Sequence, residues 1–524
     1  MTTNREKVMT NWRWVMCAML FFATTVNYMD RQVLSLTWKE FIQPEFHWTN
    51  SQYGDITGYF SIAYAIFCLF AGKFIDWMGT KKGYLIAIIV WSVGAVMHAG
   101  CGIVTELIVG VSDKAALISA VGDTASAIAM VSVYLFLTCR LILGLGEAGN
   151  FPAAIKVTAE YFPKKDRAFA TSIFNAGASV GALAAPATIP LLAKACGWEW
   201  AFIIIGALGF LWAGIWIFVY DKPTESKHVN NAELAYINQD DDSEPISAQP
   251  AEEKHMSYAK ALSYKQTWSF AFGKFMTDGV WWFFLFWAPA YFQDQFGIKA
   301  SDPQGIALIF TLYAIVTIVS LGGGYLPKVF VEKRNMEPYS GRMLAMLIFA
   351  FFPLLALFAQ PLGGIYGPWA VAIIIGIVGA AHQSWSANIF STVGDMFPKS
   401  AIATITGIGA MAGGIGSFLI NKCSGKLFDY SAGAFVADGK EFILNADGIK
   451  EAFNVQLEAG TQASGFIDTV LANGGEIVRQ PMEALGFAGT PSGYMIVFCI
   501  CAVAYLIGWS VMKLLVPKYK KVEL

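Results

Sequence analysis

Two short stretches, Glu160-Tyr-Phe-Pro-Lys164 and Asp395-Met-Phe-Pro-Lys399, decide how this chain is organised. They lie 235 residues apart, and the same offset places Val180-Gly181 on Ile415-Gly416 without a gap. Self-similarity at one fixed offset is the signature of an internal repeat. The chain is therefore predicted to contain two copies of one structural unit.

The composition indicates a membrane protein. Of the 524 residues, 56% are hydrophobic and 14% are charged, whereas soluble domains carry about 25% charged residues. This excludes an ordinary cytosolic enzyme and a disordered scaffold, and the net charge of −2 argues against a nucleic-acid binder. The eight cysteines lie mostly in apolar runs without CxxC pairs, so we interpret them as apolar packing residues rather than disulfides or metal ligands.

A membrane-spanning helix needs about 20 mostly apolar residues. We therefore predict an all-α membrane protein with twelve transmembrane helices in two pseudo-symmetric six-helix bundles. The twelve apolar runs are 14–37, 52–75, 83–104, 131–159, 168–193, 199–220, 268–292, 304–327, 342–361, 367–394, 402–424 and 493–516.

The predicted bundles are residues 1–220 and 267–524, and a polar loop at 221–266 joins them. If both termini are cytoplasmic, the inside segments hold 23 lysines and arginines and the outside segments hold 8. The positive-inside rule then supports an even number of spans with both ends in the cytoplasm. Two segments, near 105–130 and at 425–492, face outward in this topology. The pattern of the second predicts short amphipathic helices that cap the outer face.

A charged side chain at the centre of a bilayer costs about 2.5–3.5 kcal/mol, so each one is expected to face a cavity or a partner. Several charged and polar residues fall inside the predicted spans. They are Asn27, Tyr28, Asp30 and Arg31 in the first span, Arg140, Glu147 and Asn150 in the fourth, Lys274 and Asp278 in the seventh, and His382, Gln383, Ser386 and Asn388 in the tenth.

Arg31 and Arg140 predict an anionic substrate, because a guanidinium stays protonated and its flat fork fits a carboxylate. The alternative is that each arginine neutralises its neighbouring acid, Asp30 or Glu147, in a structural ion pair. These two acids are the candidates for ion coupling. A buried carboxyl group favours its protonated form, and a nearby arginine opposes this. An anion bound to the arginines weakens that opposition, so substrate binding promotes proton uptake.

The seventh and tenth spans leave two interpretations open. Lys274 and Asp278 have the spacing of a salt bridge within one helical turn, and Lys274 could equally contact substrate. His382 is either a proton relay or hydroxyl contact, or a hydrogen-bonded member of the bundle. Trp281 belongs to an aromatic cluster of which one member is expected to stack on substrate.

The loop Gly72-Lys-Phe-Ile-Asp76-Trp-Met-Gly79-Thr-Lys81-Lys82 joins the second and third spans and is predicted to be a gating latch. Gly72 permits close helix approach and Gly79 a tight turn. Asp76 can accept hydrogen bonds from a neighbouring helix N-terminus. The loop resembles the signature of the major facilitator superfamily.

Other strings resemble a family within that superfamily. Asn27-Tyr-Met-Asp30-Arg31, the stretch 140–152 and the stretch 197–209 resemble the anion:cation symporter family, and 273–282 and 381–388 are similar to bacterial hexuronate transporters. The resemblance covers nearly all of the membrane portion, and the two outer segments depart from it.

The resemblance implies proton-driven uptake of a hexuronate such as glucuronate or galacturonate by alternating access. In related sugar-acid symporters, the acids matching Asp30 and Glu147 serve proton coupling. The arginines matching Arg31 and Arg140 hold the substrate carboxylate, and the tyrosine matching Tyr28 is expected at the substrate.

The full set of residues expected to bind substrate is drawn from both bundles. It comprises Asn27, Tyr28, Arg31, Tyr64, Arg140, Asn150, Lys274, Trp281, His382, Gln383 and Asn388. We expect no enzymatic activity, cofactor or metal, because the spans hold no HExxH, phosphate loop or nucleophile–base string. The expected location is the bacterial inner membrane, where a monomer would meet lipid, protons and a small anionic substrate. An aldonate or hexarate carrier, a sodium-coupled or exporting carrier, and a non-transporting membrane sensor are the alternatives.

Overall fold

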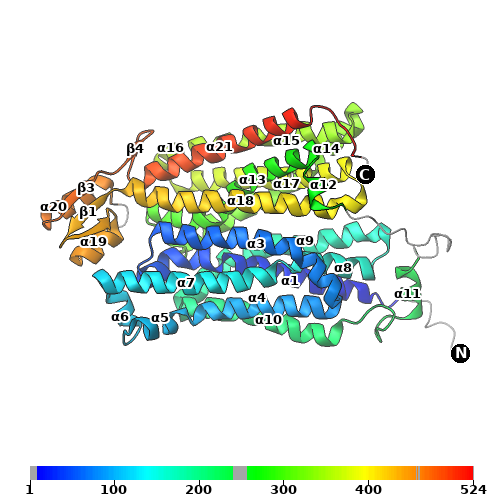
Figure 1. Ribbon diagram of the computed structural model, residues 1–524, viewed down its shortest axis with the longest axis horizontal. Helices are drawn as coiled ribbons and strands as arrows, with labels where there is room; N and C mark the ends of the chain where they lie inside the picture. The colour runs from blue at the N-terminus through cyan, green and yellow to red at the C-terminus, as the bar shows by residue number, and fades with distance from the viewer. Residues whose placement is uncertain (1–8, 240–255, 456, 458–460, 523–524) are drawn as a thin grey trace.

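The computed structural model describes residues 9–239, 256–455, 457 and 461–522. The described chain is mostly helical, and its long helices form two bundles that lie side by side (Figure 1). The first bundle contains α1 (Trp12–Thr37), η1 (Trp38–Ile42, a π-helix), α2 (Gln43–Phe46), α3 (Asn50–Met78), α4 (Thr80–Ala99), α5 (Cys101–Val109), α6 (Lys114–Ser119), α7 (Gly122–Glu147), α8 (Asn150–Tyr161), α9 (Lys164–Cys196) and α10 (Trp198–Val219).

Two short helices, α11 (Asn231–Ile237) and α12 (Tyr258–Ala261), belong to the connection between the bundles. The second bundle contains α13 (Lys265–Phe296), α14 (Pro303–Arg334), α15 (Pro338–Phe351), η3 (Phe352–Leu355), α16 (Ala356–Tyr366), α17 (Pro368–Met396), α18 (Lys399–Ala432) and α21 (Thr490–Leu515).

Twelve long helical segments correspond to the twelve predicted spans. Within the described ranges, ten are long and apolar enough to cross a membrane, with α7 and α8 counted as one segment and α15 to α16 as another. The other two are α1, with 26 residues, and α13, with 32. Both are long enough to span, and both carry charged side chains among their apolar ones.

The fourth span begins earlier than predicted. We expected it from residue 131, but α7 starts at Gly122. Asp123 and Ser126 lower the hydropathy of its first turns, so the apolar signal starts later than the helix does. The preceding segment, predicted to lie outside the membrane, is also largely helical, as α5 and α6.

The predicted repeat is confirmed in the helix boundaries. The ends of α8 and α17, and the starts of α9 and α18, are each separated by 235 residues. Pro163 and Pro398 occupy the two N-cap positions with nearly the same backbone angles, φ −62° and ψ 156° against φ −67° and ψ 155°. A proline lacks an N–H and disfavours helical geometry in the residue before it, so both breaks follow from the shared Phe-Pro sequence.

Glycines set the distance between the helices that carry the central charges. A Cβ atom at Gly177 or Gly181 of α9 would collide with backbone carbonyl oxygens of α1. A Cβ atom at Gly146 would collide in the same way with the backbone of α4. The position of Glu147, the next residue, is therefore fixed by direct backbone packing of α7 on α4.

A small α/β domain, here called the insertion, follows α18 and precedes α21. Its antiparallel sheet has the order β2-β1-β3, and its helices pack on buried Phe435, Leu444, Ile449 and Val470. The two short helices were predicted, whereas the sheet was not. The elements are β1 (Ala434–Ala437), β2 (Lys440–Ile443), α19 (Ala446–Phe453), α20 (Ala463–Ala472), β3 (Glu476–Arg479), β4 (Glu483–Ala484) and β5 (Phe487–Ala488).

The insertion lies at one end of the bundles, which we call the insertion end, and both chain termini lie at the other, the termini end (Figure 1). At the insertion end, Asp429 of α18 accepts hydrogen bonds from the backbone N–H groups of Asn50 (3.1 Å) and Ser51 (2.6 Å) at the start of α3. Lys39 pairs with Asp294 at 3.0 Å. These contacts join the first bundle to the second.

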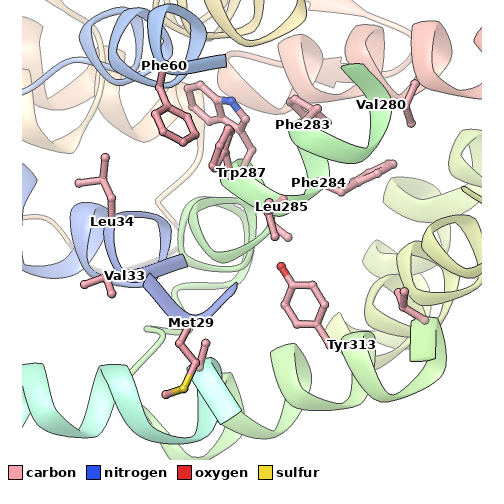
Figure 2. Packing of buried hydrophobic residues seen from close by; sticks show 14 of the residues in the cluster. Met29, Val33, Leu34, Phe60, Val280, Phe283, Phe284, Leu285, Trp287 and Tyr313 are labelled. Carbon is pink, nitrogen blue, oxygen red and sulfur yellow. The ribbon is translucent and has the colours of Figure 1, made fainter. Parts of the chain in front are cut away.

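Between the insertion end and the middle of the molecule, apolar side chains of the two bundles also pack against each other. Buried Val33 and Leu34 of α1 lie in one region with Phe60 of α3 and with Leu285 and Trp287 of α13 (Figure 2). The two bundles are thus packed together from their insertion ends inward.

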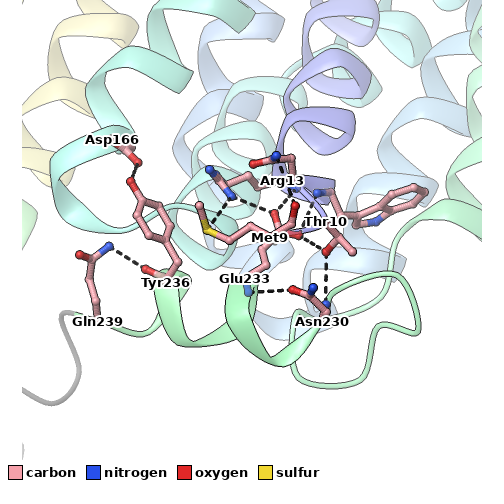
Figure 3. Close-up of polar contacts among 10 residues, drawn as sticks. Met9, Thr10, Arg13, Asp166, Asn230, Glu233, Tyr236 and Gln239 are labelled. Atoms are coloured by element: carbon pink, nitrogen blue, oxygen red, sulfur yellow. Dashed lines mark hydrogen bonds and ion pairs between the residues drawn. The ribbon is translucent and has the colours of Figure 1, made fainter. Parts of the chain in front are cut away.

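At the termini end, α11 caps the start of α1. The N-cap residue Asn11 makes no side-chain cap, and Glu233 instead accepts the backbone N–H groups of Trp12 (2.9 Å) and Arg13 (3.1 Å) and pairs with the Arg13 guanidinium (3.1 Å) (Figure 3). Burial raises the pKa of Glu233, but these hydrogen bonds and one from the Thr10 hydroxyl outweigh it and hold the pKa below its ordinary value.

Candidate functional site

The central feature is a buried ion pair between Arg31 of α1 and Glu147 of α7. Arg31 donates from Nη2 (3.0 Å) and Nε (3.2 Å) to the same oxygen, Oε2, of Glu147. The Glu147 side chain is 0% exposed, and its Oε1 has no hydrogen-bond partner in the described part of the chain. The pairing therefore joins two helices, and Arg31 does not pair with its sequence neighbour Asp30.

Arg140 and Asp30 lie near this pair and are less well satisfied. Arg140 is 2% exposed, and its Nη1 has no hydrogen-bond partner among the described residues. Asp30 is 0% exposed, and neither of its carboxyl oxygens has such a partner. It lies within electrostatic range of Glu147 and of both arginines. A buried polar group left unpaired costs about 1–3 kcal/mol, so these atoms mark a place for a proton, water or ligand.

Two amides of the first bundle also keep unused polar atoms. Asn27 is fully buried, one turn before Arg31, and both of its side-chain polar atoms lack partners among the described residues. Asn150 accepts a hydrogen bond from the Tyr84 hydroxyl (2.8 Å), while its Nδ2 has no partner in the same ranges. The first bundle thus presents both donors and acceptors that its own side chains do not use.

Three aromatic rings surround the Arg31 guanidinium. Its Cζ lies 5.2 Å from the ring centroid of Tyr28, 4.7 Å from that of Tyr64 and 5.4 Å from that of Trp282. Cations are attracted to the faces of aromatic rings at such distances. Tyr28 and Tyr64 belong to the first bundle and Trp282 to the second, so both bundles contribute rings to the surroundings of Arg31.

Three of the expected polar residues of the second bundle, Lys274, Asp278 and His382, have their partners within that bundle. Lys274 pairs with Asp278 at 2.8 Å one turn away on α13. His382 shares a 2.7 Å hydrogen bond with the Tyr505 hydroxyl and stacks on Trp281. In the described chain, no hydrogen bond or ion pair joins Lys274 or His382 to the two arginines.

Two further residues of α17 were expected at the site. Asn388 is buried and donates to the backbone carbonyl of Ser384 at 2.8 Å, within its own helix. Gln383 is half-buried. Neither is brought into contact with the arginines by a hydrogen bond within the described ranges.

The predicted latch between α3 and α4 makes contacts that its sequence did not reveal. Asp76 pairs with Lys156 of α8 at 2.7 Å, so its partner is a side chain and not a helix N-terminus. Lys81 pairs with Asp221 at 2.8 Å, and Lys82 is exposed.

The two latch glycines differ in their roles. Gly79 has φ +78°, the left-handed backbone that a glycine adopts without strain. Among the described residues, no atom lies within 4 Å of the place where Gly72 would carry a Cβ, so the expected close approach at Gly72 is wrong.

Sequence reasoning missed Trp282 and Lys156. Adjacent residues on a helix point about 100° apart, and the Trp281-Trp282 pair gives no sign of which ring faces the other bundle. Lys156 was placed inside a span, and only the break between α7 and α8 brings it to Asp76.

Comparison with known proteins agrees with this arrangement. The family model of the Major Facilitator Superfamily matches residues 20–420. A hexuronate transporter of Escherichia coli (strain K12) is 28% identical over 417 residues, which cover 80% of this chain and 88% of that protein. A galacturonate transporter of Dickeya chrysanthemi is 28% identical over 358 residues, which cover 67% of this chain and 92% of that protein.

Solved structures show the same fold at lower identity. A bacterial homolog to the human lysosomal transporter Spinster, in an inward-facing and unoccupied conformation, superposes with a TM-score of 0.63 at 17% identity and covers 96% of this chain and 98% of that one. A D-xylose-proton symporter superposes with a TM-score of 0.62 at 14% identity and covers 95% and 98%. Since the family model spans most of the residues and the paired helical bundles match these solved transporters, the chain belongs to the major facilitator superfamily and is a membrane transporter.

Proposed function

We propose that this transporter imports a sugar-acid anion, a hexuronate such as glucuronate or galacturonate, together with protons. The observation that carries the proposal is the Arg31–Glu147 pair, buried beside Arg140 and Asp30. The relatives named as hexuronate and galacturonate transporters support the substrate class.

The coupling follows from competition for one edge of Arg31. Ionised Glu147 occupies the Nε and Nη2 donors, which form the fork that a substrate carboxylate would use. Protonation removes the charge of Glu147 and frees this edge. Substrate at Arg31 then removes the cation that kept Glu147 ionised, so proton and substrate favour each other's binding.

Asp30 and Arg140 take part in the same coupling of proton and substrate binding. Arg140 has an unused Nη1 donor that could hold a second carboxylate oxygen. Asp30 has two unpartnered oxygens in the field of both arginines, and a proton taken up there would balance the added negative charge. The unpartnered amide atoms of Asn27 and the Nδ2 of Asn150 offer further hydrogen bonds to hydroxyl groups.

The direction of transport requires an orientation. The excess of lysine and arginine in the segments on the side of the termini supports an orientation with the termini end in the cytoplasm and the insertion end outside. In this orientation, the described conformation is closed toward the outside by Asp429 and by the Lys39–Asp294 pair. We therefore assign it to the part of the cycle in which the outer entrance is shut.

The test is uptake of radiolabelled glucuronate into proteoliposomes with an inward proton gradient. We expect uptake to collapse with a protonophore and in Arg31→Ala, and to persist in Arg334→Ala, an exposed arginine at the termini end of α14. Glu147→Gln should lose net uptake and keep exchange of internal for external substrate. Glutamine leaves Arg31 available to the substrate, but it cannot bind and release the coupled proton.

Two results would contradict the proposal. If uptake depends on a sodium gradient and not on the proton gradient, the coupling ion is sodium. Full proton-driven accumulation by Glu147→Gln would remove Glu147 from the coupling.

A further inference from the structure

Two adjacent tryptophans of α13 face in different directions. Trp281 packs inside its own bundle, stacked on His382 with ring centroids 5.4 Å apart and an interplanar angle of 2°. Trp282 points to the first bundle, where its ring centroid lies 5.4 Å from Arg31 Cζ and 6.0 Å from the ring of Tyr64. Of the two, Trp282 is therefore the ring that lies against Arg31.

Trp282 also keeps part of its surface accessible. It is half-buried, as Trp281 is, whereas Phe283 and Phe284 are 1% and 3% exposed. What distinguishes Trp282 is that its partly accessible ring lies beside the buried Arg31 cation, in the middle of the molecule, where an aromatic ring can contact a bound ligand.

We infer that Trp282 is the sugar-ring subsite of this transporter, the side chain on which the pyranose ring of the substrate stacks. The inference rests on the proposed function and adds the residue that distinguishes a cyclic sugar acid from an open-chain acid. It also replaces Trp281 as the stacking residue.

The chemistry of a hexuronate fits this placement. Its carboxylate is attached directly to the pyranose ring through one carbon–carbon bond of about 1.5 Å. A carboxylate held by Arg31 at hydrogen-bond distance therefore brings the ring to the immediate surroundings of the guanidinium, where the Trp282 ring lies. The C–H groups on one face of a pyranose are apolar, and they pack well on the electron-rich face of an indole.

The position of Trp282 also links recognition to the conformational cycle. Arg31 belongs to the first bundle and Trp282 to the second, so the carboxylate site and the ring site lie on different moving parts. A cyclic substrate contacts both bundles at once, whereas a carboxylate without a ring is held by the first bundle alone.

The experiment compares Trp282→Phe, Trp282→Leu and wild type for half-saturation by glucuronate and for inhibition by open-chain gluconate. Trp268→Leu, an exposed tryptophan at the start of the same helix, is the matched control. We expect Trp282→Leu to raise the glucuronate half-saturation constant about three- to tenfold, as an aromatic contact is worth. Trp282→Phe should stay within about twofold of wild type, because phenylalanine keeps a stacking face. Gluconate inhibition should change less than twofold in either variant.

The outcomes separate this inference from the proposed function. Wild-type protein that accumulates no sugar acid would remove both together. Wild-type uptake with equal glucuronate constants in Trp282→Phe and Trp282→Leu, or an equal loss of gluconate and glucuronate in Trp282→Leu, would overturn the ring subsite alone. If gluconate does not inhibit the wild type, the ring subsite is tested by the glucuronate half-saturation constants of Trp282→Phe and Trp282→Leu alone. Thermal unfolding of each purified variant shows that the compared proteins are folded.

Discussion

Two groups of charged side chains within the spans are stabilised in different ways. Lys274 and Asp278 satisfy each other one turn apart on a single helix, and Lys274 also lies over the Phe390 ring at 4.3 Å. Arg31 reaches across to Glu147 on another helix, while Arg140 and Asp30 keep unused polar atoms. A buried pair that satisfies itself does not require a ligand, whereas unsatisfied neighbours do.

This difference predicts how the α13 pair responds to substitution. Asp278→Asn leaves the Lys274 ammonium buried without a counter-charge, and breaking a buried pair in this way typically costs about 3–5 kcal/mol. The double variant Lys274→Gln, Asp278→Asn removes both charges, and we expect it to recover most of the thermal stability in detergent and most of the glucuronate uptake. A double variant that is as stable as wild type but takes up no substrate would show that Lys274 binds the anion.

The sequence identified the charged residues of the site but not their partners. Arg31 and Glu147 are 116 residues apart, and helix spacing relates only residues on one helix, so their contact depends on how α1 and α7 pack. The same limit applied to Trp281 and Trp282, since a helical pattern without an amphipathic face does not orient either ring. Composition and spacing identify the charged residues whose burial in the membrane is unfavourable. Tertiary packing determines which groups these residues contact.

At the scale of elements, the long helices followed from their apolar length and the small ones did not. The breaks before α9 and α18 were readable because Pro163 and Pro398 mark them. The sheet of the insertion has strands of at most four residues, too short for an alternating pattern to stand out. The cap of α1 was also hidden, because Glu233 lies 220 residues from Arg13.

The Glu233 cap predicts a pH-dependent start of α1. A carboxyl group whose folded pKa is below its unfolded value stabilises the fold above the unfolded pKa, and this stabilisation is lost as pH falls through the folded pKa. Hydrogen exchange at the first turns of α1, corrected for intrinsic rates, should therefore be slow at neutral pH and accelerate below about pH 4.5.

Glu233→Gln removes the charge and keeps an oxygen acceptor, so it should exchange faster at neutral pH and lose the acidic transition. Losing a cap of this kind costs about 0.5–2 kcal/mol. Exposed Glu225 in the same connection supplies the control, since Glu225→Gln should leave α1 unchanged. Equal protection in wild type and Glu233→Gln across the pH range would mean that α11 does not cap α1 in solution.

At the scale of the whole molecule, the insertion connects the two bundles. It is covalently attached to α18 and α21 of the second bundle, and Lys440 in β2 pairs with Asp123 at the start of α7 in the first bundle, at 2.7 Å. An exposed pair of this kind contributes little to stability, so Lys440→Ala is not expected to unfold the protein. Its importance is geometric, because the alternating access expected of this transporter would separate the bundles at the end where this contact lies.

A covalent link at this contact should therefore stop transport. The test uses the double variant Lys440→Cys, Asp123→Cys, in which the exposed Cys196 and Cys423 are also changed to serine. A short bis-maleimide that contains a cleavable disulfide links the two new cysteines. We expect the linked protein to lose glucuronate uptake. A reductant should restore uptake, because it cuts the link and lets the insertion leave α7. The two single-cysteine variants, and Lys328→Cys, Glu332→Cys on the exposed face of α14, should react without losing transport, since no bundle is joined to the other. Wild-type uptake by the fully cross-linked protein would mean that the insertion stays on the first bundle throughout the cycle, and that the bundles separate without moving it.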